Sequence, residues 1–498
     1  MNTQQVKGLS ATATVIMMFL AGCGGGDSGS GSHGDGVVGG VKFTVNQPAT
    51  IAQTSADDYN ANTNGLITGA TLKSWLTNWA VNRPAGITGN LVILQASAGP
   101  AGAEYIKADG VSVFTFLSPS SEWIQTRSNG VIETQSVVPD GAAMDALLKK
   151  YNIDPTKDMI VAAMGTGSTS NAMAQGRIWY ALRYWGVDKT HLAILNGGNQ
   201  WLNGNELAAA NFQVVASAAP NTGSFSVKKL TDDNTALQAT LEDLLLVLPG
   251  ADNNNKSDRV FIWDARSLSQ YSAGIKVEKG EDKDPDTAGT QACATAYCDP
   301  TNTANYAWTF QNGGSRQGHP RGAVQLQYTN LLDSTKGYSY KSKAVLAAYL
   351  AGTPDANGVG FVDGSYGVLG TGNAYQEGDT IYTYCETTFR AMITGIASAA
   401  ILGKPTRFYD GAMVEWNSLS FIKDKNGNNI LPADSPWRTD TQSYFRASPS
   451  AASVNPRTIT SAYAGTANAV VDADRAYKTG ESAGSGGGGS LPGNPCGG

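Results

Sequence analysis

The strongest constraint on the fold is an order of strand and helix patterns that occurs twice along the chain. In the first half, apolar strand patterns cover residues 90–97, 158–164 and 191–195, and amphipathic helix patterns at 142–153 and 176–186 separate them. Strands that alternate with helices form a parallel sheet, because each crossover between parallel strands needs a helix-length segment. This half is therefore predicted to be an α/β domain with helices on both faces of its sheet.

The second half repeats this order. Its strand and helix patterns lie at residues 236–248, 259–267, 340–352, 379–385, 390–403 and 406–409. The segment NGGNQW contains Gly197 and Trp201, and the segment DGAMVEW contains Gly411 and Trp416, at offsets of 214 and 215 residues. Offsets that agree this closely indicate an internal duplication. The sequence therefore predicts two α/β domains of the same kind.

The duplication sets the expected domain boundaries. Domain 1 is expected over residues 65–220 and domain 2 over 225–420, with an insertion in domain 2 at about 275–315. Residues 23–64 begin with a run of Gly, Ser and Asp that cannot bury a core, so they are expected to form a flexible tether and N-terminal extension. Residues 421–498 are polar and rich in turn residues. They are expected to be a C-terminal extension with a Gly-rich tail, which wraps the surface or is partly disordered.

The start of the chain predicts export. An apolar run, LSATATVIMMFLAG, follows Lys7 and is too short to span a bilayer, as in the core of a signal peptide. It ends in LAGC, residues 20–23, which resembles the lipobox of bacterial lipoproteins; an ordinary signal peptide with an unrelated cysteine is the alternative. Residues 1–22 are thus expected to be a lipoprotein signal peptide, and an acylated Cys23 to anchor the chain to a membrane. Gly24, and not Asp, follows Cys23. The usual sorting rule of Gram-negative lipoproteins then implies the outer membrane, with the protein facing the periplasm or the cell surface.

The charge distribution argues against nucleic acid as a partner. The net charge is −6, and the Lys and Arg residues are scattered along the chain. Nucleic-acid-binding proteins concentrate such residues in a basic patch, so no nucleic-acid partner is expected.

Cys385 is the leading candidate for a catalytic residue. In the segment IYTYCETTFRAM, a strand pattern ends at Tyr384 and a helix pattern begins near Arg390. The sulfur is therefore expected at the carboxyl end of a parallel sheet, where such folds bind ligands. Loop N–H groups, the positive end of the helix and Arg390 would all favour the nucleophilic thiolate. The alternative is a buried structural cysteine.

Four segments of the second half resemble the tandem rhodanese-domain sulfurtransferases, which include thiosulfate and mercaptopyruvate sulfurtransferases. These segments are DARS (264–267), GHPRGAVQL (318–326), CETTFR (385–390) and YDGAMVEW (409–416). The first half matches mainly in WYALRYWG and LNGGNQW. The resemblance covers roughly residues 65–420 and implies two rhodanese-like domains, of which the second is catalytic.

The resemblance also implies a reaction. Cys385 would accept sulfane sulfur as a persulfide from a small donor such as thiosulfate and pass it to a thiol or a cyanide-like acceptor. No cofactor and no metal are expected. The loop is one residue shorter than in the related phosphatases, which argues against phosphoryl chemistry. The active loop after Cys385 consists of Glu386, Thr387, Thr388, Phe389 and Arg390.

Three further residues are expected to support this loop. By the same resemblance, Asp264 and Arg266 form an ion pair that braces the active-site side of the domain. His319, in GHPRGA, is expected to hold a loop in place rather than act as an acid or base. Arg316 and Arg321 lie nearby in sequence, and either could bind an anionic donor.

The sequence departs from the family pattern at several positions. Thr388 stands where active rhodaneses often have Gly, which reaches a left-handed backbone easily. Gln270 stands where mercaptopyruvate enzymes carry a substrate-binding Arg, and Glu386 and Thr387 replace their usual Gly and Ser. These changes disfavour mercaptopyruvate, and Glu386 is expected to repel anionic donors.

Domain 1 has no equivalent thiol. Its matching strand pattern ends at Met164, and Gln95, Ala96 and Ser97 replace the Asp-Ala-Arg of domain 2. Domain 1 is therefore expected to help form the cleft and not to react.

Three cysteines remain besides Cys23 and Cys385. Cys293 and Cys298 lie in the expected insertion, where a local disulfide is the leading interpretation in an oxidising compartment. A zinc site is the poorer alternative because no histidine is near. Cys496, in the tail, is either free or forms an intermolecular link.

Two functions stay open on the sequence alone. The first is an exported, lipid-anchored sulfurtransferase acting on thiosulfate or another sulfane-sulfur or selenium compound. The second is a rhodanese-like binding or assembly lipoprotein of the outer membrane with weak or absent turnover, which the altered loop and long extensions favour.

Overall fold

The structure, a computed structural model, contains two parallel sheets with the same strand order. The strands of the first sheet are β3 (Gly65–Ile67), β4 (Leu91–Gln95), β6 (Val113–Leu117), β9 (Met159–Ala163) and β10 (Leu192–Leu195). Those of the second are β13 (Gln238–Ala239), β14 (Val260–Asp264), β18 (Val324–Gln325), β21 (Thr380–Tyr384) and β22 (Thr406–Tyr409). The orders are β3-β10-β9-β4-β6 and β13-β22-β21-β14-β18, and all neighbours are parallel. Counted along the chain, both sheets read 1-5-4-2-3, so the duplication extends to topology.

The structure describes only part of the chain. The described residues are 34–38, 41–272, 276–277, 291–292, 318–420, 428–444 and 457–480, and from Gly34 they belong to one compact unit. Several predictions concern residues outside these ranges, namely the signal peptide, Cys23, Cys293, Cys298, Arg316 and Cys496.

Helices cover both faces of the first sheet. One face packs against α4 (Gly141–Tyr151) and α5 (Thr169–Tyr184), and the other against α2 (Gly69–Thr77), α3 (Trp79–Asn82) and α6 (Asn199–Asn205). Successive side chains of β4 and β9 alternate between the two cores, as the pleat of a strand requires. A break at Asn78, whose side chain caps α3, separates α2 from α3. The predicted two-sided α/β layer is confirmed.

The second sheet is covered in the same way. The helices α10 (Lys343–Leu350) and α11 (Phe389–Ile396) pack on one face, and α7 (Leu241–Val247), α8 (Leu268–Tyr271) and α12 (Ala412–Leu419) on the other. A π-helical turn, residues 397–401, continues α11. Within the described residues, no helix is both long and apolar enough to cross a membrane.

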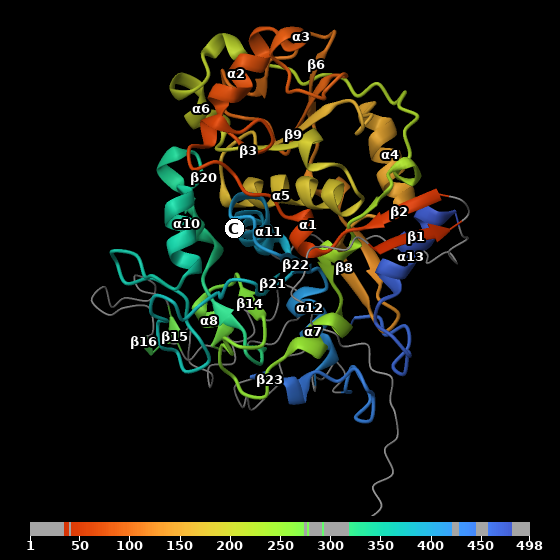
Figure 1. Cartoon of the computed structure of the whole chain (residues 1–498), viewed down its shortest axis with the longest axis vertical. Helices are drawn as coiled ribbons and strands as arrows, with labels where there is room; N and C mark the ends of the chain where they lie inside the picture. The colour runs from red at the N-terminus through yellow and green to blue at the C-terminus, as the bar shows by residue number, and fades with distance from the viewer. Residues whose placement is uncertain are drawn as a thin grey trace, which may run out of the picture. The chain divides into compact units, whose positions relative to one another are not determined.

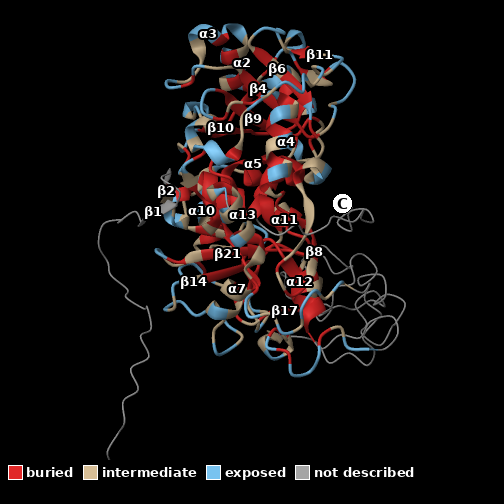
Figure 2. Ribbon diagram, turned by 90° about the vertical axis from the view of Figure 1, so that its right-hand side faces the viewer, coloured by how far each residue is buried: buried red, intermediate tan, exposed pale blue. Residues whose placement is uncertain are grey.

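The two sheets share one hydrophobic core, which is centred on α5 and α11. In Figure 1 these two helices lie side by side between the sheets, and Figure 2 shows buried residues continuing through them from one sheet to the other. A Cβ atom on Gly176 of α5 would lie 2.5 Å from the Cβ of Met392 on α11. A glycine is therefore required where the helices approach most closely.

Short strands and helices complete the described fold. The remaining strands and helices are β1 (Gly34–Val38), β2 (Val41–Val45), α1 (Pro48–Ile51), β5 (Tyr105–Ile106), β7 (Gln125–Ser128), β8 (Glu133–Val137), β11 (Phe212–Gln213), β12 (Asp232–Asp233), β15 (Lys276–Val277), β16 (Gln291–Ala292), β17 (His319–Pro320), β19 (Leu332–Asp333), β20 (Ser339–Tyr340), β23 (Ser443–Tyr444) and α13 (Ala469–Thr479).

Both extensions contain packed segments that the sequence patterns did not predict. After β2, Ile51 is buried and the N–H of Gln53 donates to the carbonyl of Ala399 at 2.8 Å, so this part of residues 23–64 is not a tether. In the C-terminal extension, α13 is a docked helix with a buried Asp474. The sequence patterns did not predict α13, because charged side chains, rather than an apolar stripe, make most of its contacts with the rest of the protein.

Candidate active site

Cys385 lies directly after β21, at the carboxyl end of the second sheet. The loop that follows is short, and α11 begins at Phe389. Cys385 has no exposed surface, and Glu386 and Phe389 are also buried. The sequence located the cysteine correctly relative to strand, loop and helix, but the sulfur is more enclosed than a freely reactive thiol.

Backbone hydrogen bonds fix the first residues of the loop. The N–H groups of Met413 and Val414, in the first turn of α12, donate to the carbonyls of Cys385 and Glu386 at 3.1 Å each. In a trans peptide the N–H group points opposite to the carbonyl. The N–H groups of Glu386 and Thr387 therefore point away from α12.

Thr388 adopts the left-handed conformation that the sequence comparison suggested for its position. Its φ is +64°, which costs a β-branched residue on the order of 1–2 kcal/mol. Its hydroxyl donates to the carbonyls of Tyr409 and Asp410, at 3.1 and 2.9 Å. These two side-chain hydrogen bonds thus hold Thr388 in a conformation that glycine adopts without them.

The start of α11 differs from that of its counterpart α5. In α5, the Ser168 side chain accepts from the N–H of Asn171 at 3.1 Å and caps the helix. In α11, Thr388 occupies the capping position but makes no such bond, because its hydroxyl is turned to β22. Within the described residues no side chain caps the start of α11, and the positive end of the helix dipole lies beside Cys385.

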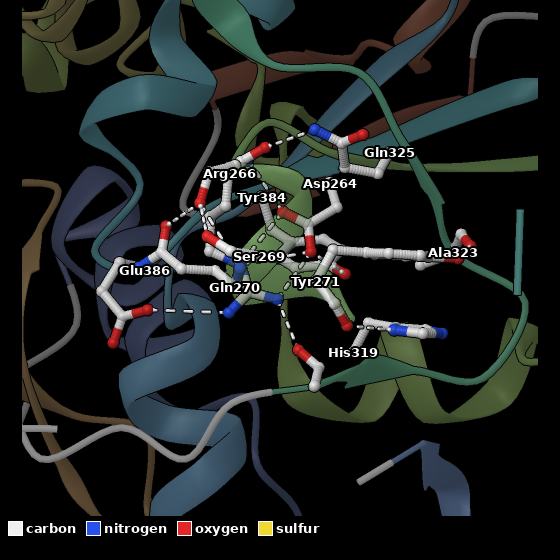
Figure 3. A network of polar contacts seen from close by, with 12 residues as sticks. Asp264, Arg266, Ser269, Gln270, Tyr271, His319, Ala323, Gln325, Tyr384 and Glu386 are labelled. Atoms are coloured by element: carbon white, nitrogen blue, oxygen red, sulfur yellow. Dashed lines mark hydrogen bonds and ion pairs between the residues drawn. The ribbon is translucent and has the colours of Figure 1, made fainter. Parts of the chain in front are cut away.

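Asp264 and Arg266 form the predicted ion pair below the loop (Figure 3). The guanidinium donates to Asp264 Oδ2 at 2.6 Å and to the carbonyl of Gly318 at 2.5 Å, and the Tyr384 hydroxyl donates to the same aspartate at 2.9 Å. Burial acts to lower the pKa of Arg266, but Asp264 outweighs it and raises that pKa. The pair connects the ends of β14 and β21, so its role here is structural.

Glu386 is a buried carboxylate beside the cysteine. Its nearest cation is Arg266, with 3.7 Å between Nη1 and Oε2 (Figure 3). Neither carboxylate oxygen accepts a hydrogen bond from the described residues. Burial raises the pKa of Glu386, although Arg266, Arg390 and Arg457 act to lower it. The expected repulsion of anions by Glu386 is therefore opposed by three guanidinium groups.

Arg390 and Gln270 are in direct contact. Arg390 Nη1 donates to Gln270 Oε1 at 2.6 Å. Gln270 thus binds the arginine of the loop. Arg321, one candidate for the anion contact, donates instead to the carbonyl of Pro249 and to Gln442.

His319 lies on the far side of the Asp264–Arg266 pair from the loop and has partners of its own. Its Nδ1 lies 2.7 Å from the carbonyl of Tyr271, its ring stacks on that tyrosine, and its Nε2 lies 3.1 Å from Asp252. These contacts agree with the predicted scaffolding role.

Domain 1 has the same strand register as domain 2 but no thiol at the position of Cys385. Gln95 pairs with Ala163 in register as Asp264 pairs with Tyr384, so Met164 stands where Cys385 does. The amide of Gln95 donates to nearby backbone carbonyls. The predicted absence of a thiol from this position follows from the register.

Four residues near the loop were not predicted as site residues. Two come from domain 1, namely Arg177 of α5 and Asn129 between β7 and β8, and two from other segments, namely Glu415 of α12 and Arg457 of the C-terminal extension. Arg177 pairs with Asp410, whose carbonyl accepts from Thr388 of the loop. Arg457 interacts electrostatically with Glu386, and Asn129 donates to Glu415. Because most of these interactions join segments far apart in the sequence, no local signal identifies them.

A polar cavity of about 400 Å³, lined in part by Arg407 and Arg475, lies elsewhere, and no residue of the loop lines it.

The described residues offer a thiol, loop N–H groups and arginines, but no metal-binding cluster. Within the described ranges, no three His, Cys, Asp or Glu side chains converge as a metal site would require. The arrangement can stabilise a thiolate and an anionic partner bound next to it.

The fold and the site define a two-domain α/β protein with a cysteine loop in its second domain. No protein-family model matches the chain, and no curated protein matches its sequence. Tum1 from Saccharomyces cerevisiae is similar in structure, with a TM-score of 0.42, 12% identity, and coverage of 71% of this chain and 95% of Tum1. SseA from Escherichia coli, described as a 3-mercaptopyruvate sulfotransferase with the rhodanese fold, has a TM-score of 0.42, 16% identity and coverage of 70% and 98%. The 3-mercaptopyruvate sulfurtransferase from Leishmania major has a TM-score of 0.39, 14% identity and coverage of 72% and 75%.

Proposed function

We propose that this chain is a sulfurtransferase that carries sulfane sulfur on Cys385. The observation that supports this most is the position of the cysteine, at the carboxyl end of β21 and before the uncapped start of α11. An anion at this position interacts favourably with the positive end of the helix. Cys385 is therefore suited to act as a thiolate nucleophile.

The proposed reaction has two half-reactions that balance without a cofactor. The Cys385 thiolate attacks the sulfane sulfur of the donor; a new S–S bond forms, the donor S–S bond breaks, and with thiosulfate the leaving group sulfite takes the electron pair. A thiolate or cyanide then attacks the terminal sulfur of the persulfide, and Cys385 leaves as the thiolate. Arg390 would hold the anionic donor during the first step.

The second candidate function is binding or assembly without substantial turnover. One observation favours it, because Cys385 is fully buried and a donor must gain access before it can react. In that case the rhodanese-like fold would serve as a scaffold.

Persulfide loading tests these two functions. Treatment with thiosulfate or a polysulfide is expected to add one sulfur atom, about 32 Da, to the peptide that contains Cys385, and cyanide is expected to remove it. Mercaptopyruvate is expected to load it least, because Gln270 stands in place of the arginine. Mass spectrometry of the peptides measures both steps.

The control is Cys385→Ser, which is nearly isosteric and should fold but take no sulfur. Arg390→Ala should slow loading more than unloading. If iodoacetamide alkylates Cys385 in the native protein but no donor transfers sulfur to it, the result contradicts the sulfurtransferase function and favours the binding function.

We also propose that the chain is exported and anchored to the outer membrane through an acylated Cys23. Its support is the apolar run that ends in LAGC. Palmitate should label the wild-type chain in a host that makes lipoproteins, and Cys23→Ala should leave the membrane fraction. An unlabelled, soluble wild-type chain would contradict this localisation.

A further inference from the structure

The polar cavity of about 400 Å³ lies where both extensions meet domain 2. One wall consists of Thr380 and Tyr382 of β21 and Arg407 of β22, and a second wall of residues from the segment 235–243. The N-terminal extension contributes the end of β2 and the start of α1, and the C-terminal extension contributes α13. A cavity of this volume can hold a small molecule. The two extensions thus complete a site that domain 2 does not form alone.

Arg407 belongs to the wall of this cavity. Its guanidinium donates to the carbonyls of Ala236 and Gln238, at 3.1 and 2.8 Å, and to the carboxylate of Asp243 at 2.6 Å. These bonds join β22 to the segment before α7 and to α7 itself. Arg407 therefore holds two sides of the cavity together, and a ligand must find its partners elsewhere in the lining.

Two charged side chains of α13 offer such partners. Arg475 Nε donates to Asp233 at 2.9 Å, whereas the two terminal nitrogens of Arg475 donate to no other described residue. Asp472 forms no ion pair with any residue that the structure describes. Both side chains are exposed and line the cavity, so they lie at its mouth.

Asp472 and Arg475 also have a useful spacing. They are three positions apart on one helix, which places their Cβ atoms about 5–6 Å from each other on the same face. Opposite charges at this spacing often pair, but these two side chains are not joined within the described part of the chain. A donor and an acceptor are therefore available side by side at the mouth of the cavity.

The charges of the lining favour a ligand that carries both signs. The described lining includes two guanidinium groups and two carboxylates, those of Arg407, Arg475, Asp243 and Asp472. A ligand with a single sign of charge would meet repulsion as well as attraction here. A molecule with a negative and a positive group can instead place each one beside its opposite.

The rest of the lining adds neutral groups. Gln47 and Thr380 line the cavity, and neither side chain forms a hydrogen bond with the residues described. Val45, Pro48 and Val471 provide apolar surface beside them. The lining therefore suits a small molecule that has a short side chain as well as its charged groups.

We propose that this cavity binds a free α-amino acid, whose carboxylate is held by Arg475 and whose ammonium group is held by Asp472. In an α-amino acid both charged groups are attached to the same carbon atom, so two side chains on one face of a helix can reach them together. The proposal does not depend on sulfur transfer, because no residue of the cysteine loop lines the cavity.

The experiment begins with saturation-transfer difference NMR on the full chain and a mixture of the protein amino acids other than cysteine. Cysteine is left out because its thiol can react at Cys385. At least one amino acid is expected to give a signal. Isothermal titration calorimetry then compares that amino acid with its N-acetyl derivative and its amide. Each derivative lacks one charge and should bind at least about tenfold more weakly, because a charged hydrogen bond is lost.

Variants locate the bound amino acid. Asp472→Asn and Arg475→Gln should each weaken binding by about tenfold, for the same reason. In Asp472→Asn, the amino acid and its N-acetyl derivative should differ less than in the wild type, because the partner of the ammonium group is gone. Arg83→Gln is the control, since Arg83 lies in domain 1, donates to the carbonyl of Thr88 and does not line the cavity. Circular dichroism checks that the variants fold.

The proposal is overturned if no amino acid binds at millimolar concentration, or if the N-acetyl derivative binds as tightly as the amino acid, which would indicate a simple anion site. It is also overturned if Arg475→Gln weakens binding no more than Arg83→Gln does, because the ligand would then bind elsewhere. Failure of persulfide loading is a different result, since it would contradict the sulfurtransferase function and leave this binding measurement intact.

Discussion

At the scale of single residues, two buried glutamates near the loop differ in how their charge is compensated. Glu386 lies 3.7 Å from Arg266 and interacts electrostatically with Arg390 and Arg457, whereas Glu415 accepts hydrogen bonds from Tyr409, Asn129 and Thr134. Neutral donors stabilise a carboxylate less than arginines do. Burial accordingly raises the pKa of Glu415 to about 7, and these hydrogen bonds only partly oppose it.

Glu415 gives a prediction about stability and pH. Its pKa is about 7 in the folded protein and 4.5 as the ordinary value, so between these values the folded state binds the proton more tightly. The free energy of unfolding should therefore fall as pH rises through this window, by about 3 kcal/mol in total. In urea denaturation from about pH 5 to about pH 8, Glu415→Gln should lose less stability than the wild type. Equal losses in both proteins would show that Glu415 does not titrate in this range.

At the scale of elements, equivalent helices in the two halves have taken different roles. The helix α5 is sixteen residues long and begins at Thr169, after the capping Ser168 and before the helix pattern predicted over 176–186. Its counterpart α11 begins after a left-handed threonine and is not capped by a side chain. The duplication preserved the position of the helix. The residues before it determine whether a side chain caps its start, as in α5, or not, as in α11.

The element that sequence patterns missed is α13. Its buried apolar residues are only Val470 and Val471, so its hydrophobic stripe is short. The helix is held mainly by the contacts of Asp474 with Arg127 and Tyr184. An ion pair between residues 347 positions apart leaves no periodic pattern in either segment.

At the scale of the whole molecule, a buried ion pair joins the two domains behind the cysteine loop. Arg177 of α5 donates to Asp410 Oδ1 at 2.6 Å, and both side chains are completely buried. The N–H of Val138 donates to the other oxygen of Asp410 at 2.7 Å, and the Asp410 carbonyl accepts from Thr388. Domain 1 therefore supports the cysteine loop through Asp410.

This connection predicts the effect of Arg177→Met. The variant leaves the Asp410 carboxylate buried without its cation, which should cost about 3–5 kcal/mol of unfolding free energy. The double variant R177M/D410N removes the lone charge and keeps an oxygen to accept from Val138. It should therefore be more stable than Arg177→Met despite its second change, as urea denaturation would measure. If the double variant is the less stable, the cost lies in packing around Arg177 and not in the charge.

The α/β class, the duplication, and the strand, loop and helix around Cys385 were predictable from the sequence. Each of these depends on residues close together in the chain, and periodicity records which side of a strand or helix is buried. The Asp264–Arg266 pair was also predictable, because its members are two residues apart and the surrounding segment resembles a known family.

The surroundings of the loop could not be predicted from the sequence. Arg177 pairs with Asp410, whose carbonyl accepts from Thr388, and Arg457 interacts electrostatically with Glu386. Their positions depend on how α5 packs on α11 and how the C-terminal extension pairs with β8, and the enclosure of Cys385 depends on the same packing. A sequence pattern reports the burial of one segment, but the charge balance at a site is a sum over segments that only the packed fold brings together.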